Sequence, residues 1–83
     1  MGFFKDTKAA ASAREAEQAF ESGRVFFTPR LNLPMTHHAA SGDIPDWAVI
    51  VEAIEASGWR LEHWSVGMDA KGRPEAYPLF RRA

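Results

Sequence analysis

Residues 59–82 read WRLEHWSVGMDAKGRPEAYPLFRR, two apolar runs joined by a short polar turn that contains a glycine. The runs 59–68 and 75–82 are rich in aromatic and other apolar residues, which favour strands when turn formers lie between them. The turn at 69–73 is short enough to join the two runs as an antiparallel hairpin. This segment therefore predicts the β-hairpin against which the other elements pack.

The apolar phase changes within the first run of the hairpin. One parity holds Trp59 and Leu61, and the other holds Trp64, Val66 and Met68. Successive side chains of a strand point to opposite faces, so a regular strand would split these residues between two faces. The change predicts either a β-bulge near Glu62 and His63 or burial on both faces of the strand.

A helix is predicted just before the hairpin, at about 44–57. Its apolar residues repeat at helical spacing and are Trp47, Ile50, Val51 and Ile54. Asp43 is the expected N-cap, with Pro45 in the first turn and Asp46 three residues after the cap. Gly58 follows the last turn, where a glycine commonly ends a helix.

A strand is predicted further upstream, at 24–33, which reads RVFFTPRLNL. Apolar residues alternate along it, with one face formed by Val25, Phe27, Pro29, Leu31 and Leu33. Pro29 has no N–H to donate to a ladder, so the strand is expected to lie at an edge or to be interrupted there.

An alanine-rich helix is predicted at the N-terminus, at about 6–22, and Gly23 ends it. An alanine stripe buries little area, so the helix either lies across its own sheet or pairs with a second copy or another partner. The candidate interface residues of this helical arm share its apolar face and its N-terminal end, and they are Phe3, Phe4, Ala9, Ala13, Ala16 and Phe20.

The expected fold class is α+β, with an N-terminal helix followed by β-α-β-β. Its three-stranded sheet would pack on one amphipathic helix. We divide the chain into an N-terminal helical arm, 1–23, and a small β-α-β-β domain, 24–83. One helix covers one face of such a sheet. The other face must then be covered by the N-terminal helix or by another subunit, or it must consist of solvent-tolerant residues.

The run from residue 47 to residue 82 resembles a family of small bacterial proteins classed as a domain of unknown function. The pattern is a helix ending in Gly-Trp-x-Leu and then a hairpin that closes on Phe followed by basic residues. The matching positions are Gly58, Trp59, Leu61, Phe80, Arg81 and Arg82. The resemblance supports the fold and carries no activity with it, because each matched residue also has a structural explanation.

Composition excludes several classes of protein. The 83 residues carry a formal net charge of −1 and contain no cysteine. The charge disfavours nucleic acid and anionic membranes as partners, and the absence of cysteine excludes disulfides and thiolate chemistry. No signal peptide or spanning segment is apparent, so a cytoplasmic protein is expected.

No motif points to catalysis or to a cofactor. His37 and His38 lie in a turn-rich stretch that is predicted to be a solvated loop, and with Asp43 or Asp46 and His63 they lack metal-binding spacing. There is no nucleophile elbow and no phosphate-cradling glycine loop. The sequence therefore favours a protein that is not an enzyme, without deciding the question, and no catalytic, metal or cofactor residues are assigned.

The leading functional hypothesis is a non-enzymatic interaction domain that forms a homo-oligomer. It would associate through the open face of its sheet, the edge of the hairpin or the alanine-rich helix. The alternative is a small-molecule-binding domain or a cofactor-free enzyme, with a pocket between sheet and helix lined by Trp47, Trp64 and Tyr77.

Overall fold

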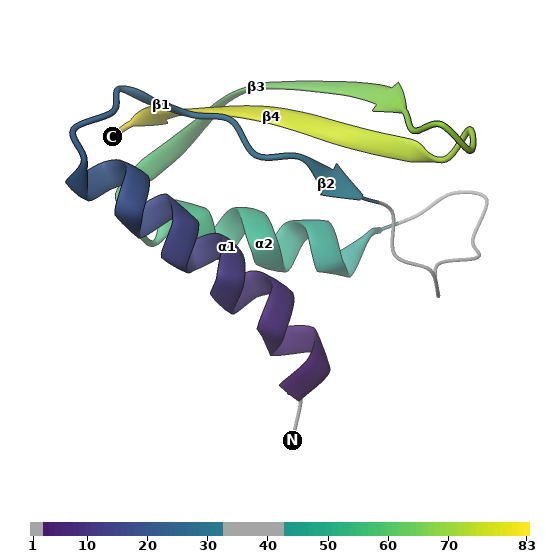
Figure 1. Ribbon diagram of the computed structural model, residues 1–83, viewed down its shortest axis with the longest axis horizontal. Coiled ribbons are helices and arrows are strands. Elements are labelled where there is room, and N and C mark those ends of the chain that lie inside the picture. The colour runs from purple at the N-terminus through teal and green to yellow at the C-terminus, as the bar shows by residue number, and fades with distance from the viewer. Residues whose placement is uncertain (1–2, 33–42) are drawn as a thin grey trace.

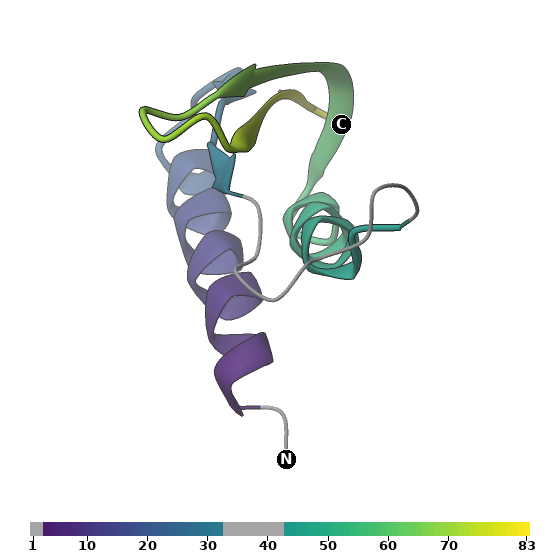
Figure 2. The same cartoon turned by 90° about the vertical axis from the view of Figure 1, so that its right-hand side faces the viewer.

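The computed structural model describes residues 3–32 and 43–83, with side chains from Ala9 onward in the first range. Two helices pack on one face of a four-stranded antiparallel sheet, so the predicted α+β class is confirmed (Figure 1, Figure 2). In chain order the elements are α1 (Phe3–Glu21), β1 (Phe26–Phe27), β2 (Leu31–Asn32), α2 (Pro45–Glu55), β3 (Trp59–Met68) and β4 (Pro74–Arg82).

The last strand of the chain, β4, lies at the centre of the sheet. β3 pairs with one side of β4, while β1 and β2 follow one another along the other side, and every pairing is antiparallel. The prediction of a β-α-β-β order and a three-stranded sheet is therefore wrong in detail. The described strands number four, and the element order is α-β-β-α-β-β.

The additional strand arises because the predicted first strand divides at Pro29. The registers of β1 and β2 on β4 are continuous with each other, and they place Pro29 opposite Pro78. Neither proline has an N–H, so neither residue of this pair can donate a backbone hydrogen bond across the ladder to the other strand. The sequence prediction left open whether Pro29 marks an edge or an interruption, and it marks both.

A β-bulge accounts for the change of apolar phase in β3. The register on β4 shifts between Leu61 and His63, so Glu62 is an additional residue without a partner of its own. Because of this insertion, Trp64 lies on the same face as Leu61, towards the helices. The sequence predicted either a bulge near Glu62 and His63 or burial on both faces, and the structure has the bulge.

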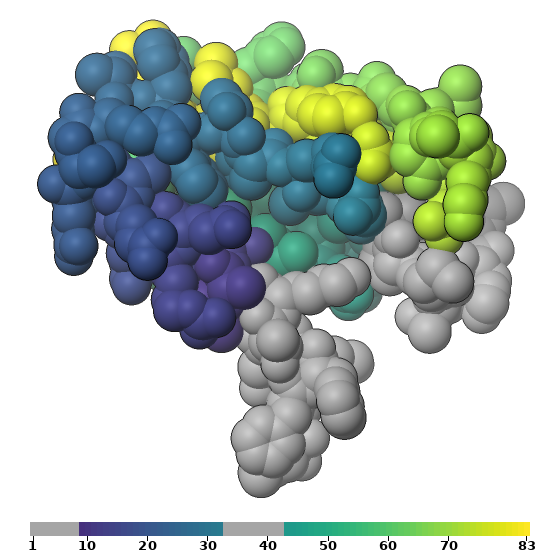
Figure 3. Space-filling view, in the orientation of Figure 1, coloured from purple at the N-terminus to yellow at the C-terminus, as the bar shows by residue number. Residues whose placement is uncertain are grey.

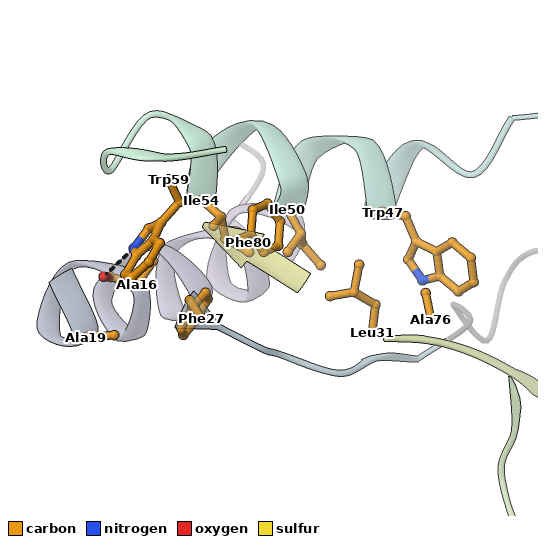
Figure 4. Packing of buried hydrophobic residues seen from close by; sticks show 10 residues of the cluster. All are labelled: Ala16, Ala19, Phe27, Leu31, Trp47, Ile50, Ile54, Trp59, Ala76 and Phe80. Atoms are coloured by element: carbon orange, nitrogen blue, oxygen red, sulfur yellow. Dashed lines mark hydrogen bonds between the residues drawn. The ribbon is translucent and has the colours of Figure 1, made fainter. Parts of the chain in front are cut away.

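The core lies between the sheet and the two helices, and Trp59 is at its centre with 1% of its surface exposed. Its indole stacks on Phe27, with ring centroids 5.8 Å apart, and meets the ring of Phe20 edge-on at 5.6 Å. The indole Nε1–H donates a 2.9 Å hydrogen bond to the carbonyl of Ala16 (Figure 4). The buried hydrophobic residues are Ala16, Ala19, Phe27, Leu31, Trp47, Ile50, Ile54, Trp59, Ala76 and Phe80.

The helix before the hairpin begins slightly later than predicted. Ile44 is the N-cap of α2, and it makes no side-chain capping bond, so the assignment of Asp43 as the cap is wrong. Pro45 occupies the first turn, where its fixed φ and missing N–H are compatible with a helix, and this places the start of the helix at Pro45.

The N-terminal helix is not a separate arm along its whole length. Its second half is part of the core, since Ala16 and Ala19 are buried against the other elements. The first half extends away from the sheet (Figure 1). The division at residue 23 thus separates elements that share one core.

Arg82, at the end of β4, ties the sheet to the end of α1. Its guanidinium donates hydrogen bonds to the carbonyls of Phe20, at 2.6 Å, and Arg24, at 2.7 Å and 3.0 Å. It also lies 3.8 Å from the centroid of the Phe20 ring. A cation close to the last carbonyls of a helix is favourable, so Arg82 stabilises the attachment of α1.

The turn of the hairpin is organised by one carboxylate, and this gives a pH-dependent prediction. Asp69 accepts hydrogen bonds from the backbone N–H of Arg73 (2.8 Å) and of Lys71 (2.9 Å). The bond from Arg73 is the main cause that lowers the pKa of Asp69 below its ordinary value. Because the pKa of Asp69 is lower in the folded state, its ionised carboxylate stabilises the fold at a pH above the unfolded-state pKa. This stabilisation is lost as the pH falls through the folded-state pKa.

We therefore expect the amide resonances of Lys71 and Arg73 to shift together on acidification, with a midpoint below the pKa of a free aspartate, as measured by an NMR titration. An Asp69→Asn variant should abolish that transition. A midpoint at the ordinary aspartate value, or an unchanged transition in the variant, would contradict this role of Asp69.

Candidate functional site: the open face and the free edge of the sheet

The three aromatic residues predicted to line a pocket do not meet. Trp47 and Trp64 lie together under the sheet, with ring centroids 5.7 Å apart, and Trp47 Nε1–H donates a 2.7 Å bond to the Asn32 carbonyl. Tyr77 pairs with Ser65 on the opposite face of the sheet. The two hollows described, of about 410 and 200 Å³, lie against α1, and neither includes Trp64 or Tyr77 in its lining.

The candidate interface residues of α1 divide into two groups. Ala16 is fully buried in the core of its own chain, and Phe20 packs against that core, so both have internal contacts. Ala9 and Ala13 are half-buried. The side chains of Phe3 and Phe4 lie outside the described residues.

The candidate metal ligands are only partly described. His37 and His38 lie outside the described residues. Within 9–32 and 43–83, no group of three His, Cys, Asp or Glu side chains is arranged to hold a metal ion. Neither helix described has the length and apolar character needed to cross a membrane.

No described helix or strand covers the face of the sheet away from α1 and α2 (Figure 2), and we call it the open face. At one end, Arg81 of β4 is flanked by Phe26 of β1 and Arg60 of β3. The Arg81 guanidinium lies 4.6 Å from the centroid of the Phe26 ring, and its Nε donates a 2.6 Å bond to Glu62. That hydrogen bond is the main cause that lowers the pKa of Glu62 and raises the pKa of Arg81.

A second polar cluster occupies the other end of the open face. The Tyr77 hydroxyl donates a 2.6 Å hydrogen bond to Glu75, whose carboxylate also lies 3.8 Å from Arg30. The bond to Glu75 is the main cause that raises the pKa of Tyr77. The Tyr77 ring covers Gly67, since a Cβ at that position would lie 3.1 Å from the ring. The aromatic rings of this face thus have partners within the chain.

The two edges of the sheet differ strongly. Along one edge, β1 and β2 are two residues each and are separated by the segment that contains Pro29. Along the other edge, β3 is ten residues long, and among the described strands it pairs with β4 alone. Strand edges of this length present unpaired N–H and C=O groups that can add another strand.

Among the described residues, a contact covers the first part of the β3 edge. The backbone N–H of Leu61 points away from β4 and donates a 3.1 Å bond to a carboxylate oxygen of Glu55, at the end of α2. The sequence from Trp64 to Met68, WSVGM, contains neither a charge nor a proline. Charged residues and prolines are common protection of an edge, and this part of β3 has neither.

Exposed apolar side chains accompany the unprotected edge. Val66 is 58% exposed and Met68 is 72% exposed, and Met68 is the most exposed large hydrophobic residue among those described. Both lie on the helix-facing side of a hairpin that extends past the start of α2 (Figure 1). In the space-filling view the end of the hairpin stands at the margin of the molecule (Figure 3).

Comparison with known proteins adds no relative. No family model, curated protein or solved structure matches the chain. The resemblance to a small bacterial family therefore has no support beyond its own motif. The matched residues have structural roles, since Trp59 and Phe80 are core residues and Gly58 has a φ of +104° beside the Phe20 ring.

The free edge of β3 was only one of three interfaces that the sequence suggested. The signal for it was present in the apolar parity of Trp64, Val66 and Met68. Parity alone does not tell a central strand from an edge strand, however, and the position of β4 in the sheet decides this.

Proposed function

We propose that this protein is a non-enzymatic interaction domain whose partner is a second copy of itself, bound along the edge of β3. We further propose that it acts in the cytoplasm, which suits a chain without cysteine. The observation that carries the proposal is the contrast between the two sheet edges. One is short and interrupted by proline, and the other is long and uncharged over residues 64–68.

The other two surfaces have weaker support as the interface. On α1, Ala16 and Phe20 pack against the chain's own core. On the open face, Arg81 and Glu62 neutralise each other, and Tyr77 and Glu75 are hydrogen-bonded. Polar groups that already have partners lose little by remaining in water, whereas the unpaired backbone of an edge gains hydrogen bonds when a strand is added.

Light scattering coupled to size-exclusion chromatography, over a range of concentrations, tests this proposal. The unmodified chain should show a concentration-dependent dimer. The double variant Val66→Lys/Met68→Lys should weaken association by about a hundredfold, because a symmetric interface brings like charges together.

A matched control is Val25→Lys/Asn32→Lys, which adds the same charge at two exposed residues along the edge of β1 and β2, separated from β3 by β4, and it should dimerise like the unmodified chain. A chain that stays monomeric at every concentration would overturn the proposal. A dimer that survives the Val66/Met68 change would place the interface elsewhere on the molecule.

A further inference from the structure

We infer that two copies join their β3 strands antiparallel, with Val66 on the two-fold axis, and that this pairing closes as a dimer. The inference rests on the proposed function, because it specifies the register and the size of the assembly that the free edge forms. It follows from the direction of the backbone groups of β3, from the exposed side chains and from the state of the opposite edge.

The first step is to identify the residues whose backbone points outward. The N–H of Leu61 does so, since it bonds to Glu55 at the side of β3 away from β4. In β4 the N–H of Arg82 points towards β1, since it donates a 3.1 Å bond to the Val25 carbonyl. Every second residue of β4 points its backbone groups in the same direction. After the bulge, the β3 residues that pair with these β4 residues therefore point their backbone groups outward. These positions are Trp64, Val66 and Met68, opposite Pro78, Ala76 and Pro74.

The second step selects the centre of the pairing. When two copies of a strand pair antiparallel, the two-fold axis is perpendicular to the sheet, and the residue at the axis lies opposite the same residue of the second copy. This axis leaves each side chain on the face of the sheet that it already occupies. An axis at Trp64 or Ser65 would set an outward residue against the bulged Glu62. An axis at Gly67 or Met68 would set an outward residue against the turn. An axis at Val66 sets Trp64 against Met68 of the second copy, so every outward backbone group of this segment finds a partner in β3.

The side chains suit the same register. On the helix-facing side Val66 meets Val66 of the second copy, and the exposed Met68 meets Trp64. Thioether and indole groups pack favourably, and the pairing would bury the two exposed apolar side chains described above.

The end of the seam brings no like charges together. Beyond Met68, the register sets Asp69 of one copy, where the turn begins, opposite His63 of the other. A carboxylate opposite an imidazole, which can donate a hydrogen bond, is compatible with this alignment.

The edge formed by β1 and β2 determines whether a third copy can add to the dimer. It consists of two-residue strands on either side of the segment in which Pro29 faces Pro78. Such an edge offers no long ladder to a third copy. The assembly is therefore a closed dimer with one continuous sheet across both copies, and not a filament.

Single-cysteine crosslinking tests the register, and the chain suits it because it contains no cysteine. Val66→Cys should form a disulfide-linked dimer under mild oxidation, since hydrogen-bonded antiparallel neighbours have Cα atoms about 5.5 Å apart, within the range of a disulfide. The matched control is Met68→Cys, the next outward residue. Its two copies would lie about 13 Å apart along the strands, so it should crosslink at least tenfold more slowly.

The outcomes separate the inference from the proposed function. If the unmodified chain dimerises but Met68→Cys crosslinks faster than Val66→Cys, the register is wrong and the self-association stands. If Asn32→Cys, on the edge formed by β1 and β2, crosslinks instead, the interface is not the edge of β3, and the inference and the proposed function are both overturned. A chain that is monomeric by light scattering would overturn both.

Discussion

Trp59→Ala is expected to leave the protein without a cooperative unfolding transition at room temperature. Removing a buried aromatic side chain of this size costs about 3–5 kcal/mol, and a core in a chain this small supplies only about that much net stability. Trp59 also donates the buried hydrogen bond to Ala16 and contacts Phe20 and Phe27. Its loss would therefore separate α1 from the sheet.

Denaturant unfolding followed by far-UV circular dichroism measures this effect. Trp59→Phe is the informative companion, because it keeps an aromatic ring but removes the Nε1–H donor and part of the indole volume. It should fold with a loss of about 2–3 kcal/mol, from the missing buried hydrogen bond and the small cavity together. If Trp59→Ala unfolded at the same denaturant concentration as the unmodified chain, the central role of Trp59 would be refuted.

Gly58→Ala is expected to destabilise the fold by about 2–4 kcal/mol, through two separate effects. The backbone φ of Gly58 is +104°, a conformation that costs an L-residue about 1–2 kcal/mol. In addition, a Cβ at this position would lie 2.6 Å from Cε2 of Phe20, so the ring would have to move.

Gly23→Ala provides the matched control for this substitution. Gly23 also has a positive φ, +86°, but a Cβ there would have no neighbouring atom within 4 Å. We expect it to cost about 1 kcal/mol, the conformational part alone. In a Phe20→Ala background the additional cost at Gly58 should disappear, and equal costs at the two glycines would contradict the steric contribution.

Most local structure of this chain was predictable because it depends on near neighbours. The helical spacing of Trp47, Ile50 and Ile54 led to α2, and the turn at 69–73 led to the hairpin. The altered parity after Leu61 predicted a bulge, and Pro29 predicted an edge or an interruption. Each of these depends on periodicity or on a missing N–H within a few residues.

The candidate site was predictable only in part. Of the three residues predicted to line a pocket, Trp47 and Trp64 lie side by side, but Tyr77 lies on the other face. In β4 the side chains of Phe80, Pro78 and Ala76 face the core. Tyr77 has the opposite parity in the strand and therefore lies on the other face. The start of α2 was also misplaced, because Asp43 has the chemistry of a cap but lies outside the first turn.

The sequence by itself determined the two helices and the hairpin. It limited the phase change in β3 to a bulge or burial on both faces, and Pro29 to an edge or an interruption. Only the tertiary structure decided that β4 is central, that α1 packs on the same face as α2, and that β3 is left as a long free edge. The physical reason is that strand order and helix placement depend on contacts between distant segments. The bond from Trp59 to Ala16 and those from Arg82 to Phe20 and Arg24 are such contacts, and no local pattern encodes them.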